Sequence, residues 1–148
     1  MSQDQKPRIL IVDDDIVSRI TISKVLRNQG YNYLEAFDFH TALSMLKTIH
    51  FDMVITDNNM SGMSGMDLLT VIKQKWPEMA VIIVADTSKF SVVLNCIKKG
   101  AADYIAKPYD LVKLAQSIRR ILETRAEQVE APSEAPAEVQ VDAPAPAT

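Results

Sequence analysis

The stretch that decides the fold reads Arg8-Ile9-Leu10-Ile11-Val12-Asp13-Asp14-Asp15, an apolar run that leads directly into three carboxylates. A near-continuous run of branched apolar residues is typical of a parallel strand that is covered on both faces. Crowded carboxylates repel one another and are costly to bury without a compensating cation, and oxygen ligands suit a hard ion such as Mg²⁺. The stretch therefore predicts a buried strand that ends in either a metal site or a solvated acidic turn.

Four more short apolar runs follow, and longer helical patterns separate them. The predicted strands are Arg8–Val12, Tyr31–Ala36, Met53–Thr56, Val81–Ala85 and Asp103–Ala106. The predicted helices are Val17–Gln29, Phe39–Ile49, Gly65–Lys75, Lys89–Lys99 and a fifth that begins near Asp110. This alternation predicts an α/β fold in which helices cover both faces of a five-stranded parallel sheet. In such sheets the functional site lies beyond the carboxyl ends of the strands.

Size and composition favour one globular domain. The chain has 148 residues, of which 47% are hydrophobic and 24% charged. We predict a folded domain at 7–126, between a disordered N-terminus at 1–6 and a disordered Ala/Pro/Glu-rich tail at 127–148. No apolar run approaches the roughly 18–20 residues of a membrane span, and the N-terminus lacks the apolar core of a signal peptide. Together with a single cysteine, Cys96, these features predict a cytoplasmic protein without a membrane partner.

The charge is distributed unevenly along the chain. The net charge is −3, and the segment from Glu127 onward holds five acidic residues and no Lys or Arg. The preceding residues are therefore close to neutral. A near-neutral domain with an acidic tail lacks the basic surface of a nucleic-acid-binding protein, so we expect no nucleic-acid partner.

Chemically active side chains follow three of the predicted strands. Asp13 and Asp14 follow the first strand, Asp57 and Asn59 the third, and Lys107 the fifth. We expect these three strands to be neighbours, which would bring the acidic side chains and the lysine together. Asp13 and Asp14 could hold Mg²⁺, and Asp57 could add a further oxygen and act as a nucleophile toward a phosphoryl group. Lys107 could neutralise a phosphoryl oxygen.

This constellation resembles the response-regulator receiver domain of two-component signalling, over about residues 7–126. The matching segments are Asp13-Asp14, Asp57-Asn58-Asn59-Met60-Ser61-Gly62-Met63-Ser64-Gly65, Lys98-Lys99-Gly100-Ala101-Ala102-Asp103-Tyr104 and Lys107-Pro108. Each segment alone is a weak signal. In this order, and with 43 residues from Asp14 to Asp57 and 50 from Asp57 to Lys107, they are specific together.

The resemblance implies a flavodoxin-like (βα)5 fold and a function. Asp57 would accept a phosphoryl group from a sensor histidine kinase or a phosphotransfer protein. Mg²⁺ would be held by Asp13, Asp14 and Asp57, with the backbone carbonyl of Asn59 as a further ligand. Tyr104 matches the aromatic switch position of the family, and the bond before the proline of the Lys-Pro pair is often cis.

Two positions depart from the family pattern. Ser61 stands where the family usually has proline, which should only loosen the loop. Ala85 stands at the end of the fourth strand, where the family usually has Thr or Ser to contact the phosphoryl group. Either Thr87 or Ser88 supplies a hydroxyl through a shifted loop, or no hydroxyl is used and the coupling of phosphorylation to Tyr104 is weaker or works differently. The gapless alignment favours the second interpretation, which would remove about 0.5–1.5 kcal/mol of net hydrogen-bond energy.

The favoured interpretation is a stand-alone receiver that is not an enzyme, apart from self-phosphorylation and self-dephosphorylation, and that signals through a protein partner. Two alternatives stay open. Asp13-Asp14-Asp15-Ile16-Val17 also fits the nucleophile loop of haloacid-dehalogenase-like phosphatases, with Asp13 as nucleophile. A pseudo-receiver, an interaction module that is never phosphorylated, is supported only by Ala85.

Overall fold

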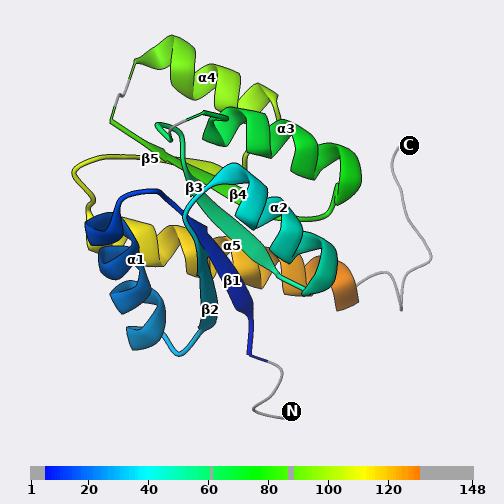
Figure 1. The fold of residues 1–148 in the computed structure, drawn as a ribbon. Coiled ribbons are helices and arrows are strands. Elements are labelled where there is room, and N and C mark those ends of the chain that lie inside the picture. Colours follow the sequence, from blue (N-terminus) through cyan, green and yellow to red (C-terminus); the bar gives the residue numbers. More distant parts are fainter. Residues whose placement is uncertain (1–5, 61, 87–88, 131–148) are drawn as a thin grey trace, which may run out of the picture.

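A computed structural model describes residues 6–60, 62–86 and 89–130, in which strands and helices alternate (Figure 1). The strands are β1 (Arg8–Val12), β2 (Asn32–Ala36), β3 (Met53–Asp57), β4 (Ala80–Ala85) and β5 (Asp103–Ala106). The helices are α1 (Ile16–Asn28), α2 (Phe39–Thr48), α3 (Gly65–Lys75), α4 (Phe90–Lys98) and α5 (Leu111–Glu130). Among these described helices, none combines the length and apolar character needed to cross a membrane.

The strands form one parallel sheet in the order β2-β1-β3-β4-β5. α1 and α5 cover one face, and α2, α3 and α4 cover the other (Figure 1). The predicted α/β fold class is therefore confirmed. The strand order reverses between β1 and β3, so the loops after these two strands diverge to opposite faces and leave a crevice at their carboxyl ends.

One sequence expectation about the sheet is wrong. We expected the first, third and fifth strands to be neighbours, but β4 lies between β3 and β5. The connections through α3 and α4 both run over the same face of the sheet, so each adds its strand on the outer side of the preceding one. A residue that follows β5 must therefore reach past the end of β4 to meet one that follows β3.

The pleat of the central strands divides the core into two layers. In β1, Ile9 and Ile11 pack toward α1 and α5, whereas Leu10 and Val12 pack toward the three helices on the opposite face. All five residues of β3 are buried. Successive side chains of a strand point to opposite faces, so a strand covered on both sides must be apolar throughout. This explains why the segment before the acidic triplet contains no alternating polar residues.

The helix starts follow the capping residues. Asp15 caps α1 by accepting a hydrogen bond from the backbone N–H of Ser18, and Asp38 caps α2 through the N–H of Thr41. Ser64 begins α3 with a reciprocal capping box that is completed by Asp67. Most element bounds lie within a residue of those predicted. α5 continues to Glu130, past the predicted domain boundary at residue 126, and residues 1–5 and 131–148 lie outside the described residues.

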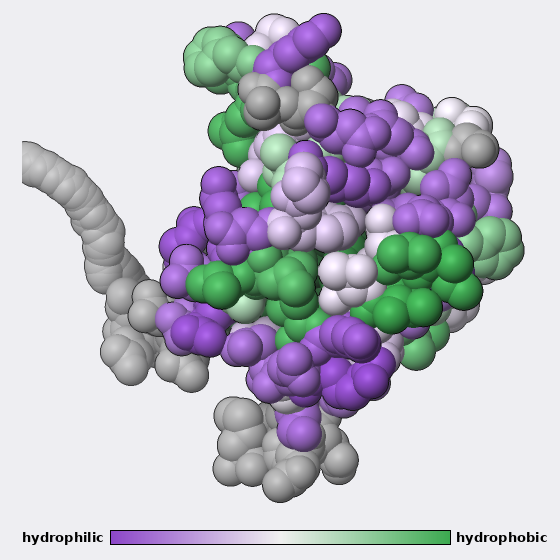
Figure 2. All heavy atoms as spheres, turned by 90° about the vertical axis from the view of Figure 1, so that its left-hand side faces the viewer, coloured by the Kyte–Doolittle hydropathy of each residue, from purple (hydrophilic) through white to green (hydrophobic). Residues whose placement is uncertain are grey.

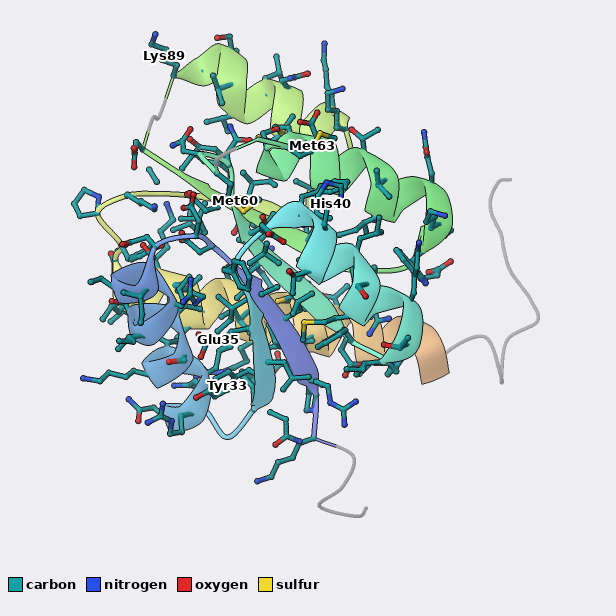
Figure 3. The ribbon with its side chains drawn as sticks, viewed as in Figure 1. Tyr33, Glu35, His40, Met60, Met63 and Lys89 are labelled. Carbon is teal, nitrogen blue, oxygen red and sulfur yellow. The ribbon has the colours of Figure 1, made fainter. Side chains whose placement is uncertain are left out.

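Side chains of the edge strand β2 tie it to α1. Tyr33 and Glu35 both lie on the α1 side of the sheet (Figure 3). The Arg19 guanidinium donates to Glu35 at 3.0 Å, and Arg27 donates to the Tyr33 hydroxyl at 3.0 Å. These contacts fix the position of α1, whose first turn follows the acidic triplet directly.

Gly65, the first residue of α3, packs directly on the backbone that carries Asp57. A Cβ at this position would lie 2.5 Å from the Asp57 carbonyl oxygen and 3.0 Å from the Asn58 Cα. Because both contacts are with backbone, relief requires a shift of the β3–α3 junction. We therefore expect Gly65→Ala to lower the free energy of unfolding by roughly 1–3 kcal/mol in urea denaturation. Gln74→Ala, at an exposed position of the same helix, is the control; equal stability of the two variants would contradict this packing argument.

Candidate functional site

The acidic side chains gather at the carboxyl ends of β1 and β3, where the strand order reverses. Asp13 is 1% exposed and Asp57 is 3% exposed, whereas Asp14 lies at the surface. One carboxylate oxygen from each of the three lies within 4.8 Å of those from the other two. The backbone holds these positions, since the Asp13 N–H donates to the Ala36 carbonyl and the Asn58 N–H donates to the Val84 carbonyl.

Lys107 brings one positive charge into this acidic pocket. Its Nζ lies 3.0 Å from Asp57 Oδ1 and 4.0 Å from Asp13 Oδ2. The lysine follows β5, so its side chain passes the end of β4 to reach Asp57 on β3. Its backbone N–H donates to the Ala85 carbonyl at 2.8 Å, which holds the loop against β4. The lysine is thus placed by the sheet, although the two strands are not neighbours.

The two oxygens of Asp13 have different surroundings. Oδ1 accepts a hydrogen bond from the Asp15 backbone N–H at 2.9 Å, and Arg19 donates to the Asp13 carbonyl at 2.7 Å. Oδ2 is buried and has no hydrogen-bond partner among the described residues. Asp57 Oδ1 is likewise buried, and its ion pair with Lys107 does not have hydrogen-bond geometry. Two carboxylate oxygens therefore face the pocket with unused acceptor capacity.

Burial makes ionisation of these carboxylates costly. It raises the pKa of Asp13 from its ordinary value of 3.8 to about 6; the Asp15 N–H opposes this rise and the Asp57 charge adds to it. Burial also raises the pKa of Asp57, although Lys107 opposes the rise. Burial alone would lower the pKa of Lys107, but its contact with Asp57 outweighs that effect and the pKa is raised. The single positive charge of Lys107 therefore offsets only part of the negative charge of the three carboxylates.

The donor set fits a hard divalent cation. Three carboxylates converge, and among the described residues two of them carry buried oxygens without a hydrogen-bond partner and no sulfur or imidazole joins the cluster. Such all-oxygen clusters suit Mg²⁺, which also keeps several of its own waters. A cation here would satisfy the unused oxygens and reduce the repulsion between the acids.

Comparison with known proteins agrees with this geometry. Residues 9–119 match the family described as the response regulator receiver domain. The chain belongs to the response regulator receiver family. Receiver domains of this family bind Mg²⁺ in an acidic pocket, and they are signalling modules of two-component response regulators.

Individual relatives show how far the likeness extends. The receiver is 36% identical to chemotaxis protein CheY of Pseudomonas aeruginosa over 119 residues, which cover 78% of this chain and 96% of that protein. It is 34% identical to transcriptional regulatory protein ZraR of Salmonella typhimurium over 126 residues, which cover 84% of this chain but only 29% of ZraR. The CheY-like receiver structure from Methanospirillum hungatei superposes with a TM-score of 0.79 at 26% identity, covering 84% of this chain and 99% of that one.

The receiver structure brings together four of the residues selected from sequence. Asp13, Asp14, Asp57 and Lys107 meet in the acidic pocket. Asn59 is exposed two residues beyond Asp57, and its backbone N–H opposes the rise in the Asp57 pKa. Its carbonyl as a metal ligand stays a prediction. The Lys107–Pro108 peptide bond is cis, as the resemblance implies.

The predicted switch residues have a more mixed outcome. Tyr104 is 8% exposed and packs into the cluster that contains Cys96, where burial raises its pKa. Ala85 ends β4 and is fully buried, so no hydroxyl projects from this position. Thr87 and Ser88 lie outside the described residues, so the interpretation with a shifted loop stays open.

Two residues near the site were not singled out from the sequence. The Asn58 side chain accepts a hydrogen bond from the Met66 N–H at 3.1 Å, which connects the loop after Asp57 to the first turn of α3. An amide directly after the strand could have suggested this role. Tyr109, two residues beyond Lys107, has a buried hydroxyl, which only the packing reveals. The methionines of the β3–α3 loop divide between core and surface, with Met60 buried and Met63 exposed (Figure 3).

Proposed function

We propose that Asp57 accepts a phosphoryl group from a phosphohistidine of a sensor histidine kinase or phosphotransfer protein, and that the transfer depends on Mg²⁺. The observation that carries this proposal is the pairing of a nearly fully buried Asp57 with Lys107 Nζ at 3.0 Å, beside two further carboxylates. A buried nucleophile with one fixed cation and an all-oxygen metal site has the parts that phosphoryl transfer needs.

In the proposed reaction an oxygen of Asp57 attacks the phosphorus of the donor. A phosphorus–oxygen bond forms, the phosphorus–nitrogen bond breaks, and the imidazole leaves. Lys107 then faces the added phosphoryl oxygens instead of pairing with the carboxylate alone. Asp13, Asp14, Asp57 and the Asn59 carbonyl would hold Mg²⁺, which when bound offsets the negative charge of the phosphoryl oxygens. The chain's own contribution is positioning and electrostatic stabilisation.

A docking partner would need a surface around the pocket, and exposed apolar side chains are present there. Ile16 is 60% exposed and Val17 65% exposed on α1, and Val112 is 66% exposed on α5. Hydrophobic side chains gather on this side of the molecule (Figure 2). The two helices are in contact, so one partner helix could touch both while a phosphohistidine enters the pocket. Exposed apolar groups of this kind favour protein docking.

We propose that phosphorylation changes the β4–β5 face of the sheet and so alters affinity for a downstream protein. Tyr104 on β5 is the residue through which this change would pass. Because Ala85 has no hydroxyl, we expect the coupling to be weaker than in relatives with Thr or Ser there. The function would be signalling and not enzymatic turnover of a separate substrate. A cytoplasmic location, and the absence of nucleic-acid and membrane partners, stay predictions.

Labelling with radioactive acetyl phosphate tests the proposal against its two alternatives. We expect label that requires Mg²⁺ and that peptide mapping places on Asp57. Label on Asp13 would favour a haloacid-dehalogenase-like nucleophile, although the family match over residues 9–119 weighs against it. A wild-type protein that takes up no label with Mg²⁺ present would favour the pseudo-receiver.

A further inference from the structure

Arg19 joins three separate parts of the molecule beside the acidic pocket. Its backbone lies in the first turn of α1, where the Arg19 N–H donates to the Asp15 carbonyl at 3.1 Å. Its guanidinium donates from Nε to Glu35 Oε1 on β2 at 3.0 Å and from Nη1 to the Asp13 carbonyl at 2.7 Å. The side chain is 16% exposed. A planar guanidinium that bonds two partners at once has a fixed orientation.

The carbonyl that accepts the second of these bonds belongs to the peptide between Asp13 and Asp14. Rotation of that peptide would turn the two carboxylates relative to each other, because the side chains are attached at its two ends. These two carboxylates, together with that of Asp57, supply the oxygens that lie within 4.8 Å of one another. The hydrogen bond from Arg19 therefore acts, through the backbone, on the geometry of the candidate metal site.

Arg27 shows what a purely structural arginine at this interface would do. It lies about two turns further along α1, and its guanidinium donates to the Tyr33 hydroxyl of the same strand at 3.0 Å. Both arginines thus tie α1 to β2, but Arg19 also bonds to the backbone of the acidic turn. Comparison of the two arginines separates the anchoring of the helix from an effect on the site.

A purely electrostatic role for Arg19 would change the metal affinity in the opposite direction. A positive charge beside an acidic pocket repels a divalent cation, so removal of the charge alone would strengthen Mg²⁺ binding. Loss of a contact that holds the acidic turn would weaken binding, since a turn that is not fixed in advance must be ordered when the cation binds. The direction of the change in affinity therefore distinguishes the two roles.

We propose that Arg19 is a positioning residue for divalent-cation binding, which holds the Asp13–Asp14 peptide in place while Glu35 anchors its guanidinium. This inference rests on the metal requirement of the proposed function. Groups that orient the ligands of a metal commonly change its affinity by about 10–100-fold. Arg19 bonds to the backbone between two ligands and not to a ligand oxygen itself, so a smaller factor is expected.

Two variants of Arg19 test this role. Arg19→Met keeps an apolar stem and loses both donors, and we expect its dissociation constant for Mg²⁺, measured by isothermal titration calorimetry, to rise about three- to tenfold. Arg19→Lys keeps the charge, but its ammonium does not reproduce the two-armed contact, so we expect a rise of about two- to fivefold. In the metal-free protein, the Asp15 N–H donates to Asp13 Oδ1 at 2.9 Å, and its hydrogen exchange should be about three- to tenfold faster in Arg19→Met.

Arg27→Met is the matched control. It removes the other contact between α1 and β2, and it should leave the Mg²⁺ affinity and the exchange of the Asp15 amide at wild-type values. The positioning role is wrong if Arg19→Met binds Mg²⁺ as tightly as wild type or more tightly, or if Arg27→Met weakens binding equally. If Arg19→Met does not fold, wild-type affinity of Arg19→Lys would overturn the role.

The wild type distinguishes failure of this inference from failure of the proposed function. If the Arg19 variants bind Mg²⁺ normally but wild-type Asp57 is labelled by acetyl phosphate in the presence of Mg²⁺, the positioning role is wrong and the phosphoacceptor function stands. Failure of the wild type to bind Mg²⁺ at all would overturn both.

Discussion

Asp57→Asn should abolish labelling by acetyl phosphate, a loss of at least about a thousandfold that leaves only background signal. The amide has nearly the shape of the carboxylate, so the β3–α3 junction should keep its structure. It has no nucleophilic oxygen anion, and it cannot form the ion pair that joins the Asp57 carboxylate to Lys107 at 3.0 Å. Mass spectrometry of the intact protein, with and without Mg²⁺, measures the loss.

Asp86→Asn provides the control for this variant. Asp86 is exposed just after β4, and its charge acts on Asp57, but it lies outside the metal cluster. Its removal should leave labelling within about twofold of wild type, because an exposed charge is well screened by solvent. Residual label in Asp57→Asn at wild-type level would mean that another residue accepts the phosphoryl group.

Asp13→Asn should make the metal-free protein more stable and at the same time remove most of its response to Mg²⁺. The Asp13 carboxylate is 1% exposed, and burial raises its pKa from 3.8 to about 6. At pH 7.5 the wild type must ionise this group inside the fold, whereas asparagine has no charge and can still accept the Asp15 N–H bond. A shift of this size corresponds to roughly 3 kcal/mol, so we expect a gain of about 1–3 kcal/mol in the free energy of unfolding.

The raised pKa of Asp13 also predicts how the free energy of unfolding depends on pH. The folded protein holds the Asp13 proton more tightly than the unfolded chain does, so wild-type stability rises as the pH falls from about 6 toward 3.8. The advantage of Asp13→Asn is therefore complete above pH 6 and disappears below about pH 4. Urea denaturation in chelator at pH 7.5 and at pH 4 measures both limits.

Asp14→Asn is the matched control, because Asp14 belongs to the same metal cluster but is exposed. It should weaken stabilisation by Mg²⁺ without stabilising the metal-free protein. If Asp13→Asn instead destabilises the metal-free protein at pH 7.5, then the buried Asp13 charge does not lower the stability of the metal-free wild type, and this prediction is wrong. If both variants retain the full response to Mg²⁺, the cation binds elsewhere.

The features that could be predicted from sequence are those that depend on local pattern. The apolar run from Ile9 to Val12 indicates a strand covered on both faces, and β1 has that environment. Capping residues such as Asp15 and Asp38 mark helix starts because their hydrogen bonds are made within a few residues. The sequence places Asp13 and Asp57 at the ends of two strands, and this correctly predicts that they lie close together because β1 and β3 are neighbours.

Features that depend on packing between distant segments were not accessible in this way. The reach of Lys107 past β4 depends on strand order, which alternation alone does not determine. The buried hydroxyl of Tyr109 depends on how the loop after β5 closes against α1. Neither the tyrosine itself nor its spacing from Lys107 indicates that its hydroxyl is buried. Such placements arise from tertiary contacts that act across the whole chain.

The most direct test of the phosphoacceptor pocket is an NMR titration of wild type and Asp57→Asn, first with Mg²⁺ and then with beryllofluoride as a phosphoryl mimic. In wild type we expect Mg²⁺ to shift the amide signals around Asp13 and Asp57, and beryllofluoride to add shifts at Lys107 and Tyr104. In Asp57→Asn the beryllofluoride response should be absent. A wild-type protein whose spectrum does not change with Mg²⁺ and beryllofluoride would contradict the assignment of Asp57 as the phosphoacceptor.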